Sequence, residues 1–176
     1  SRQNRYLQLD HWKAIQSMCK RADAVICGTQ EQKEDILPFC SNTHIILDAQ
    51  STIARSQKED YSSGKTFNLV WQGLPENIIF FNEIKDVLQS IKSNYDIALH
   101  IVTNLSYYQY LNKVKKSYTH EVTQKIFQPT YLYDWNEELC SKIITSCDMA
   151  LIPMSLEDPF FRGKPENKLL LFWLMG

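Results

Sequence analysis

The chain has 176 residues, of which 44% are hydrophobic and 22% charged, with a formal net charge of −1 at pH 7. This composition is typical of a globular chain of one domain or parts of two, and its balanced charge excludes a global attraction to nucleic acid or acidic lipid. The five cysteines form no Cys-x-x-Cys pair, and the four histidines are scattered. We therefore expect reduced cysteines, a cytoplasmic protein and no metal site.

The first quarter of the chain alternates between helical and strand patterns. Its predicted elements are a helix at Tyr6–Arg21, a strand at 22–29, a helix at Gln30–Phe39 and a strand at His44–Asp48. Thr29 and Gln32 have the spacing of a capping box, which supports a helix start at Gln30. The polar stretch Ala49–Lys65 predicts a linker or a long surface loop.

A cleaner alternation of strands and helices begins at Phe67. The predicted strands are 67–71, 97–103, 122–128 and 149–153, and the predicted helices are Asn77–Ser93, Leu105–Lys116, Asn136–Ser146 and Pro165–Met175. Strands that alternate with helices in this way predict an α/β fold with a doubly wound parallel, Rossmann-like sheet. We interpret His100 as a packed strand residue, and we place the lysines at 113, 115 and 116 on a solvated helix face that needs no partner.

The loops that follow the predicted strands are the expected ligand edge of such a sheet. Gly73 follows the first strand, where a missing side chain lets backbone amides approach a ligand, although a plain turn glycine fits equally well. Tyr131, Tyr133 and Trp135 share one predicted loop, 129–136, and either stack on a planar base or pack locally.

The last fifteen residues, RGKPENKLLLFWLMG, predict a helix that begins at Pro165. Lys164 and Lys168 flank this start, four apart and so on one helical face. Cations near a helix N-terminus are repelled by about 0.3–1 kcal/mol each, and a bound phosphate reverses the sign of that effect. A second interpretation is that nearby acidic side chains neutralise the lysines, namely Glu157, Asp158 and Glu166.

Four short motifs carry a resemblance to a known family: WQG after the first strand, YDW before a helix, CDMALIP at a strand, and KPENKLLLFWLMG. Together they resemble the C-terminal domain of a GT-B glycosyltransferase, and the last is similar to a Lys-x-x-Asn-Lys…Gly segment of bacterial family 4 enzymes. The resemblance implies that residues 1–49 end an N-terminal, acceptor-side domain, 50–66 form a linker, and 67–176 form a truncated nucleotide-sugar domain. We therefore expect a fragment of a longer protein.

The resemblance implies transfer of a sugar from a nucleoside-diphosphate sugar to an unknown acceptor (a glycan, a lipid-linked molecule or a protein) in bacterial polysaccharide biosynthesis. It implies no metal, no other cofactor and no nucleic acid, and any peripheral membrane association would run through the missing N-terminal domain. The implied donor-binding residues are a phosphate-binding group, an aromatic group for the base, and one glycine; they are Arg162, Lys164, Asn167, Lys168, Tyr133, Trp135 and Gly73.

Two departures from the family pattern leave the catalytic residues unassigned. Gly163 and Leu171 stand where many retaining members carry a pair of glutamates, and the first basic residue after the first strand is Lys85. Two alternatives stay open for this reason. One is a nucleotide-sugar 2-epimerase of the same fold, and the other is a catalytically inactive GT-B binding module.

Overall fold

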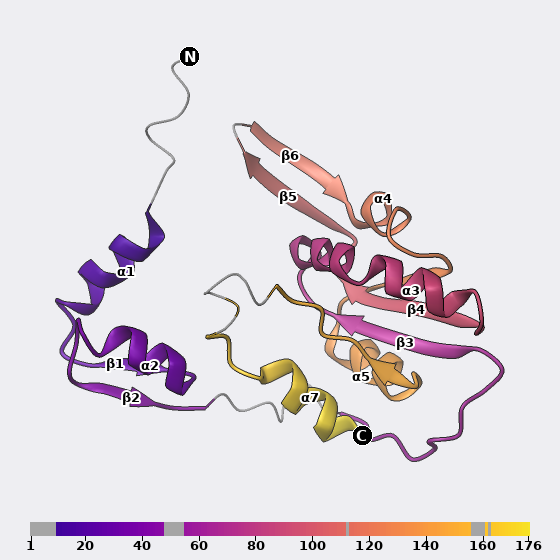
Figure 1. Cartoon of the computed structure of the whole chain (residues 1–176), viewed down its shortest axis with the longest axis horizontal. Helices are drawn as coiled ribbons and strands as arrows, with labels where there is room; N and C mark the ends of the chain where they lie inside the picture. The colour runs from indigo at the N-terminus through magenta and orange to yellow at the C-terminus, as the bar shows by residue number, and fades with distance from the viewer. Residues whose placement is uncertain (1–9, 48–54, 112, 156–160, 162) are drawn as a thin grey trace. The chain divides into compact units, whose positions relative to one another are not determined.

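A computed structural model describes residues 10–47, 55–111, 113–155, 161 and 163–176 (Figure 1). The chain forms two compact units. Unit 1 comprises residues 1–49 and 156–165, and unit 2 comprises residues 50–155 and 166–176. The segment after the last strand of unit 2 thus belongs to unit 1 before the chain returns to unit 2.

Unit 1 contains two short helices and a pair of parallel strands. The elements in chain order are α1 (His11–Cys19), β1 (Val25–Cys27), α2 (Gln30–Ile36) and β2 (Thr43–Ile45). The predicted capping box is confirmed: Thr29 Oγ1 accepts a hydrogen bond from Gln32 N, and Gln32 Oε1 accepts one from Gly28 N. A small core holds the unit together, formed by the buried side chains of Cys19, Cys27, Ile36 and Cys40.

Unit 2 is built on a four-stranded parallel sheet, as the strand–helix alternation predicts. Its strands are β3 (Phe67–Gln72), β4 (Ile97–Thr103), β7 (Thr130–Asp134) and β8 (Met149–Ala150), in the spatial order β7-β4-β3-β8. Strand β4 pairs with one side of β3, and β7 pairs with the far side of β4. The last strand, β8, then pairs with the other side of β3. The order therefore reverses between β3 and β8, which makes this gap the switch point of a Rossmann-like sheet.

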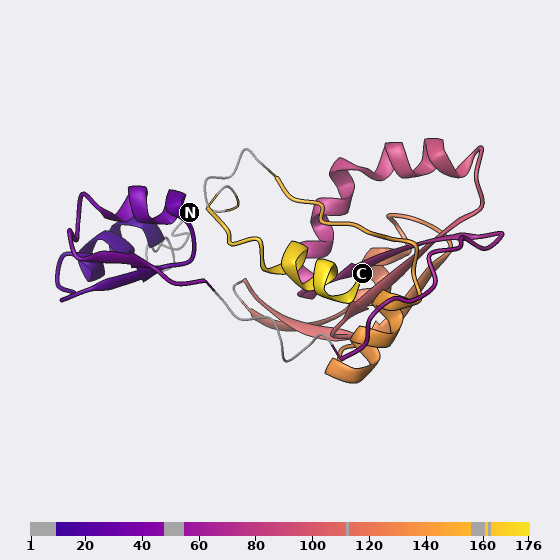
Figure 2. The same ribbon diagram turned by 90° about the horizontal axis from the view of Figure 1, so that it is seen from below.

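Helices cover both faces of this sheet (Figure 2). The first face packs against the 3-10 helix η1 (Pro75–Glu83) and α3 (Lys85–Lys92), and the second packs against α5 (Glu137–Thr145) and α7 (Asn167–Met175). The helix predicted at Asn77–Ser93 is thus divided in two. The division falls at Ile84, whose φ of −113° and ψ of 3° lie outside the helical region.

The helix predicted at Leu105–Lys116 is wrong. These residues form an antiparallel hairpin of β5 (Ser106–Leu111) and β6 (Lys113–Tyr118), in register from Ser106↔Tyr118 to Leu111↔Lys113. The segment is rich in tyrosine, which favours strands, and the cross-strand pairs that decide the structure join residues distant in sequence. The lysines at 113, 115 and 116 therefore lie on a strand and not on a helix.

The strand predicted at 122–128 is also wrong. The chain forms the short helix α4 (Thr119–Thr123) and then a turn in which the neighbours Ile126 and Phe127 are both buried. Local bonds shape this segment, because Ile126 N donates to Thr123 O at 3.0 Å and Gln124 N donates to His120 O at 3.1 Å. The third strand of the four-stranded sheet is instead β7, which occupies most of the predicted aromatic loop 129–136.

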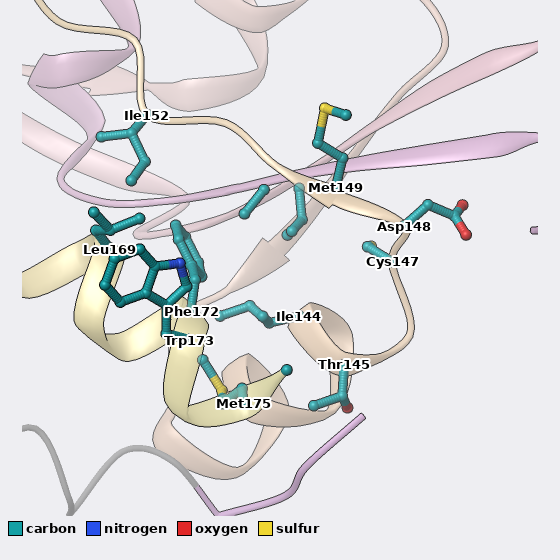
Figure 3. A pocket seen from close by; sticks show the side chains of 13 residues that line it. Ile144, Thr145, Cys147, Asp148, Met149, Ile152, Leu169, Phe172, Trp173 and Met175 are labelled. Atoms are coloured by element: carbon teal, nitrogen blue, oxygen red, sulfur yellow. The ribbon is translucent and has the colours of Figure 1, made fainter. Parts of the chain in front are cut away.

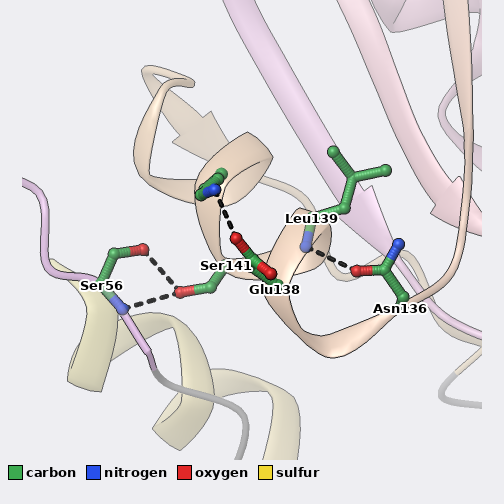
Figure 4. A network of polar contacts seen from close by, with 6 residues as sticks. Ser56, Asn136, Glu138, Leu139 and Ser141 are labelled. Atoms are coloured by element: carbon green, nitrogen blue, oxygen red, sulfur yellow. Dashed lines mark hydrogen bonds and ion pairs between the residues drawn. The ribbon is translucent and has the colours of Figure 1, made fainter.

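Residues 55–58 of the predicted linker pack against α5 and α7 of unit 2. Ser141 Oγ of α5 accepts a hydrogen bond from the backbone N–H of Ser56 at 2.9 Å (Figure 4). It accepts a second from the backbone N–H of Arg55 at 3.2 Å. Lys58 N donates to Met175 O of α7 at 2.6 Å, and its Nζ donates to Cys147 O at 2.7 Å. Residues 55–58 therefore bind to α5 and α7 instead of forming an open surface loop.

Candidate functional site

Gly73 and Lys168, which are far apart in the sequence, meet at the carboxyl end of β3. Lys168 is the second residue of α7, and its Nζ lies 4.9 Å from the centroid of the Trp71 ring. The same Nζ lies 2.6 Å from the position that a Cβ atom on Gly73 would occupy. The structure thus places an ammonium group against a glycine at the switch point of the sheet.

The backbone around Gly73 is held by the neighbouring strand. Gly73 N donates to Val102 O at 3.3 Å, and the buried hydroxyl of Thr103 donates to Gly73 O at 2.6 Å. Cζ2 of the buried Trp71 also lies 2.6 Å from the missing Cβ position. Any side chain at residue 73 would therefore collide with Trp71 and Lys168, so the packing of the chain itself requires a glycine here.

Trp71, the first residue of the WQG motif, and Thr103 complete this arrangement, and no role was predicted for either side chain from the sequence. Both stand at or near the carboxyl ends of adjacent parallel strands. The carboxyl ends of parallel strands meet at one edge of the sheet, beside the candidate ligand loops. Thr103 ends a long apolar strand at this edge, and that position could have identified it from the sequence.

The start of the last helix differs from the prediction. Helix α7 begins at Asn167, with Glu166 as its N-cap residue and no hydrogen bond from that side chain to the helix start. Lys164 and Pro165 precede the helix, so the prediction that Lys164 and Lys168 share one helical face is wrong. Contacts within unit 1 explain the difference.

Residues 163–165 are held by the N-terminal end of α2. The buried Thr29 Oγ1 donates to Gly163 O at 3.0 Å, and Cγ of Pro165 lies 2.9 Å from the Cβ position of Gly28. These contacts with residues distant in sequence fix Pro165 outside the helix, against its local preference for the first helical position.

The predicted phosphate-binding residues are divided between the two units. Asn167 and Lys168 are half-buried at the start of α7 in unit 2. Lys164 belongs to unit 1, is exposed, and has its Nζ 3.6 Å from the centroid of the Phe161 ring. Arg162, Glu157 and Asp158 lie outside the described residues.

The aromatic residues of the predicted loop are not gathered in one loop. Tyr131 and Tyr133 belong to β7, and Trp135, just beyond this strand, is 39% exposed. The Tyr133 ring stacks on His100, with centroids 5.8 Å apart and an angle of 9° between the planes. Strand β4 lies between β7 and β3, so Tyr133 is two strand spacings, about 10 Å, from the strand that leads into Gly73.

His100 is a hydrogen-bonded residue of the second sheet face, as predicted. Asn68 Nδ2 donates to Thr66 O, which turns its Oδ1 toward His100 Nε2 at 3.1 Å. Nε2 therefore carries the proton, and Nδ1 accepts a hydrogen bond from the Tyr133 hydroxyl at 3.0 Å. Burial lowers the pKa of His100 and raises that of Tyr133, so the chain Asn68–His100–Tyr133 is neutral.

Within the ranges given above, no group of three or more His, Cys, Asp or Glu side chains is placed to hold a metal ion. None of the helices described is both long and apolar enough to cross a bilayer.

Comparisons with known proteins do not identify a function, so the residues at the carboxyl edge of the unit 2 sheet are the main guide to it. No model of a known protein family matches the chain, and no curated protein matches it.

Proposed function

We propose that this chain is the donor-binding part of a GT-B glycosyltransferase and that it takes a nucleoside-diphosphate sugar at the carboxyl edge of the unit 2 sheet. The observation that carries the proposal is the position of Lys168 Nζ against Gly73, between the end of β3 and the start of α7. Ligands of open parallel sheets bind at this kind of switch point.

The diphosphate is the part of the donor that the site fits best. Its negative charge increases as the bond to the sugar breaks, and a fixed cation at a helix N-terminus stabilises that charge without a metal ion. Lys168 supplies the cation, and Asn167 at the same helix start is placed to meet a phosphate or ribose oxygen. A lysine near the positive end of a helix, unfavourable by itself, becomes favourable once the phosphate binds.

The remaining donor contacts are assigned as follows. Trp135, partly exposed just beyond β7, is our choice for the nucleobase because the Tyr133 hydroxyl already bonds His100. Lys164 and Arg162 are proposed as phosphate contacts on the resemblance alone. We assign no catalytic base. We place the reaction in the cytoplasm, with an acceptor in bacterial glycan synthesis.

Isothermal titration calorimetry with UDP, GDP and ADP tests the proposal. We expect micromolar binding of one nucleotide that persists in EDTA. Lys168→Ala should weaken it by about 1.5–3 kcal/mol, the range for hydrogen bonds to charged groups. The matched control is Lys92→Ala, because Lys92 also lies over an aromatic ring, with Nζ 5.4 Å from the centroid of Phe127, but on α3.

Three results would contradict the proposal or change its class. Failure of all three nucleotides to bind a folded protein rejects it, and equal weakening by both lysine variants rejects the role of Lys168. Binding without sugar transfer or epimerisation of the bound donor would favour an inactive module. That alternative has one specific observation in its support: Leu171, which stands where many members of the family it resembles carry glutamate, is a core residue 3% exposed.

A further inference from the structure

The two edges of the unit 2 sheet are protected to different degrees. Strand β8 forms one edge and is only 2 residues long, and Pro153 follows it closely. Short edge strands and prolines are common devices by which proteins prevent a sheet from pairing further. Strand β7 forms the other edge, and its sequence, TYLYD, contains no proline, lysine or arginine. Among the residues that the structure describes, no strand pairs with the outer edge of β7.

The register between β7 and β4 determines which backbone groups of β7 face outward. Leu99 N donates to Pro129 O at 3.1 Å, and Leu99 is paired with Thr130. In a parallel ladder, alternate residues of a strand direct their N–H and C=O groups to the same neighbour, so the odd-numbered positions of β7 face β4. The backbone groups that face outward are those of Thr130, Leu132 and Asp134.

The sequence of β7 is complementary to itself when two copies run antiparallel. With the pairing centred on Leu132, this residue lies opposite its counterpart, and Thr130 lies opposite Asp134 of the second copy. Tyr131 and Tyr133 then form a non-hydrogen-bonded pair, in which the side chains approach most closely. Tyr131 is 50% exposed. Aromatic cross-strand pairs of this kind stabilise antiparallel strands.

The charges at the two ends of β7 are complementary in the same arrangement. Lys92 is exposed at the start of the strand, where its Nζ donates to Gln128 O, and the exposed Asp134 ends the strand. Both belong to the first sheet face, because Lys92 Nζ lies over Phe127 of that core and Asp134 alternates with Leu132, which packs on it. Antiparallel pairing places Asp134 of the second copy two residues, about 7 Å along the strand, from Gln128. This separation is within reach of a lysine side chain.

We infer that two copies of this chain associate through β7 and form one continuous sheet across a twofold axis. Such an interface uses the same strand of both copies, so each favourable contact occurs twice. Any extended peptide offers backbone groups to an open sheet edge. A second copy also supplies the matched tyrosine pairs and two contacts between Lys92 and Asp134. The inference does not depend on the donor site.

Sedimentation velocity of the whole chain over a range of concentrations tests this inference. We expect a reversible equilibrium between monomer and dimer. Tyr131→Lys places a charge within the pairing and should weaken the dimer by roughly tenfold to a hundredfold. The matched control, Tyr95→Lys, changes a tyrosine that is 67% exposed outside β7 and should leave the dimer unchanged.

Charge reversal tests the arrangement of the two copies. Lys92→Glu and Asp134→Lys should each weaken the dimer by roughly fivefold to twentyfold, because each substitution changes two symmetric contacts. The double variant restores opposite charges and should regain most of the lost affinity. Circular dichroism confirms that each variant is folded.

Hydrogen exchange locates the interface directly. The outward-facing amide of Leu132 should exchange more slowly as the concentration of the chain rises. The amide of Leu99, which is already bonded inside the sheet, should not respond to concentration.

Three results would overturn the inference. One is a chain that stays monomeric at millimolar concentration. Another is a dimer that Tyr131→Lys and the two charge reversals leave intact. The third is a dimer that is lost when the exposed Trp173 and Leu174 of α7 are both changed to glutamine while the amide of Leu132 shows no dependence on concentration, because that dimer would form through α7.

Discussion

The two faces of the unit 2 sheet use the same strands for different purposes. The first face is mainly apolar, with Leu69 and Trp71 of β3 beside Leu99 and Ile101 of β4, and Thr103 at its edge. The second face, one residue out of step along each strand, carries the hydrogen-bonded chain Asn68–His100–Tyr133 as well as apolar side chains. Because successive strand residues point to opposite faces, apolar side chains fill the first face and the hydrogen-bonded side chains lie on the second.

The packing differs as well. On the second face, a cavity of about 220 Å³ lies between α7, the end of α5 and β8 (Figure 3). Its walls are mainly apolar and include Val70, Ile144, Leu169, Phe172 and Met175. Helix α7, which carries Lys168, thus lies beside open space on this face, into which its side chains can relax.

Matched leucine truncations give the largest expected effect. Leu99 is 0% exposed on the first face, and Leu171 is 3% exposed on the second. Leu→Ala changes in cores cost about 2–5 kcal/mol, and the cost falls when the surroundings can collapse. We expect Leu99→Ala near the top of this range and Leu171→Ala near the bottom, measured by urea unfolding. Equal costs, or a higher cost at Leu171, would show that α7 cannot shift toward the cavity.

The contact between Ser141 and residues 55–56 gives the next effect. Ser141→Ala removes a buried acceptor of two backbone N–H groups and should lower the free energy of unfolding by about 1–3 kcal/mol. Ser146→Ala, at an exposed position just after the same helix, is the control and should change it by less than about 0.5 kcal/mol. If the two variants unfold alike, the bonds to Ser141 do not hold residues 55–58 in solution.

The elements predicted best from the sequence are those that a local pattern of apolar residues determines. β3 and β4 were predicted within a residue of their bounds, since long apolar runs are typical of strands buried on both faces. The hairpin at 106–118 could not be predicted in the same way. Its tyrosines satisfy a helical pattern about as well as a strand pattern, and only the cross-strand pairing distinguishes the two.

The candidate site shows the same limit. Gly73 and Lys168 were each named from the sequence, but their proximity depends on the strand order that brings β8 and α7 back beside β3. Lys164 was assigned to the helix of Lys168 because local preference favours Pro165 at a helix start. The bond from Thr29 to Gly163 overrides that preference, and nothing in the local sequence reports it.

The smallest expected effect is the pH dependence of the polar face. Burial lowers the pKa of His100 in the folded chain below its value of about 6.5 in the unfolded chain, so the unfolded chain binds more protons as pH falls. The stability that neutral His100 contributes is therefore complete above about pH 6.5 and is lost as pH falls through the folded pKa. We expect the difference in unfolding free energy between the wild type and His100→Gln to shrink as pH falls from 7 to 5, because the other titrating groups cancel in that difference. Two curves that stay parallel across this interval would mean that His100 is protonated as readily in the folded sheet as in the unfolded chain. The chain of hydrogen bonds from Asn68 to Tyr133 would then not hold a neutral ring, and the contrast between the two faces would be one of packing alone.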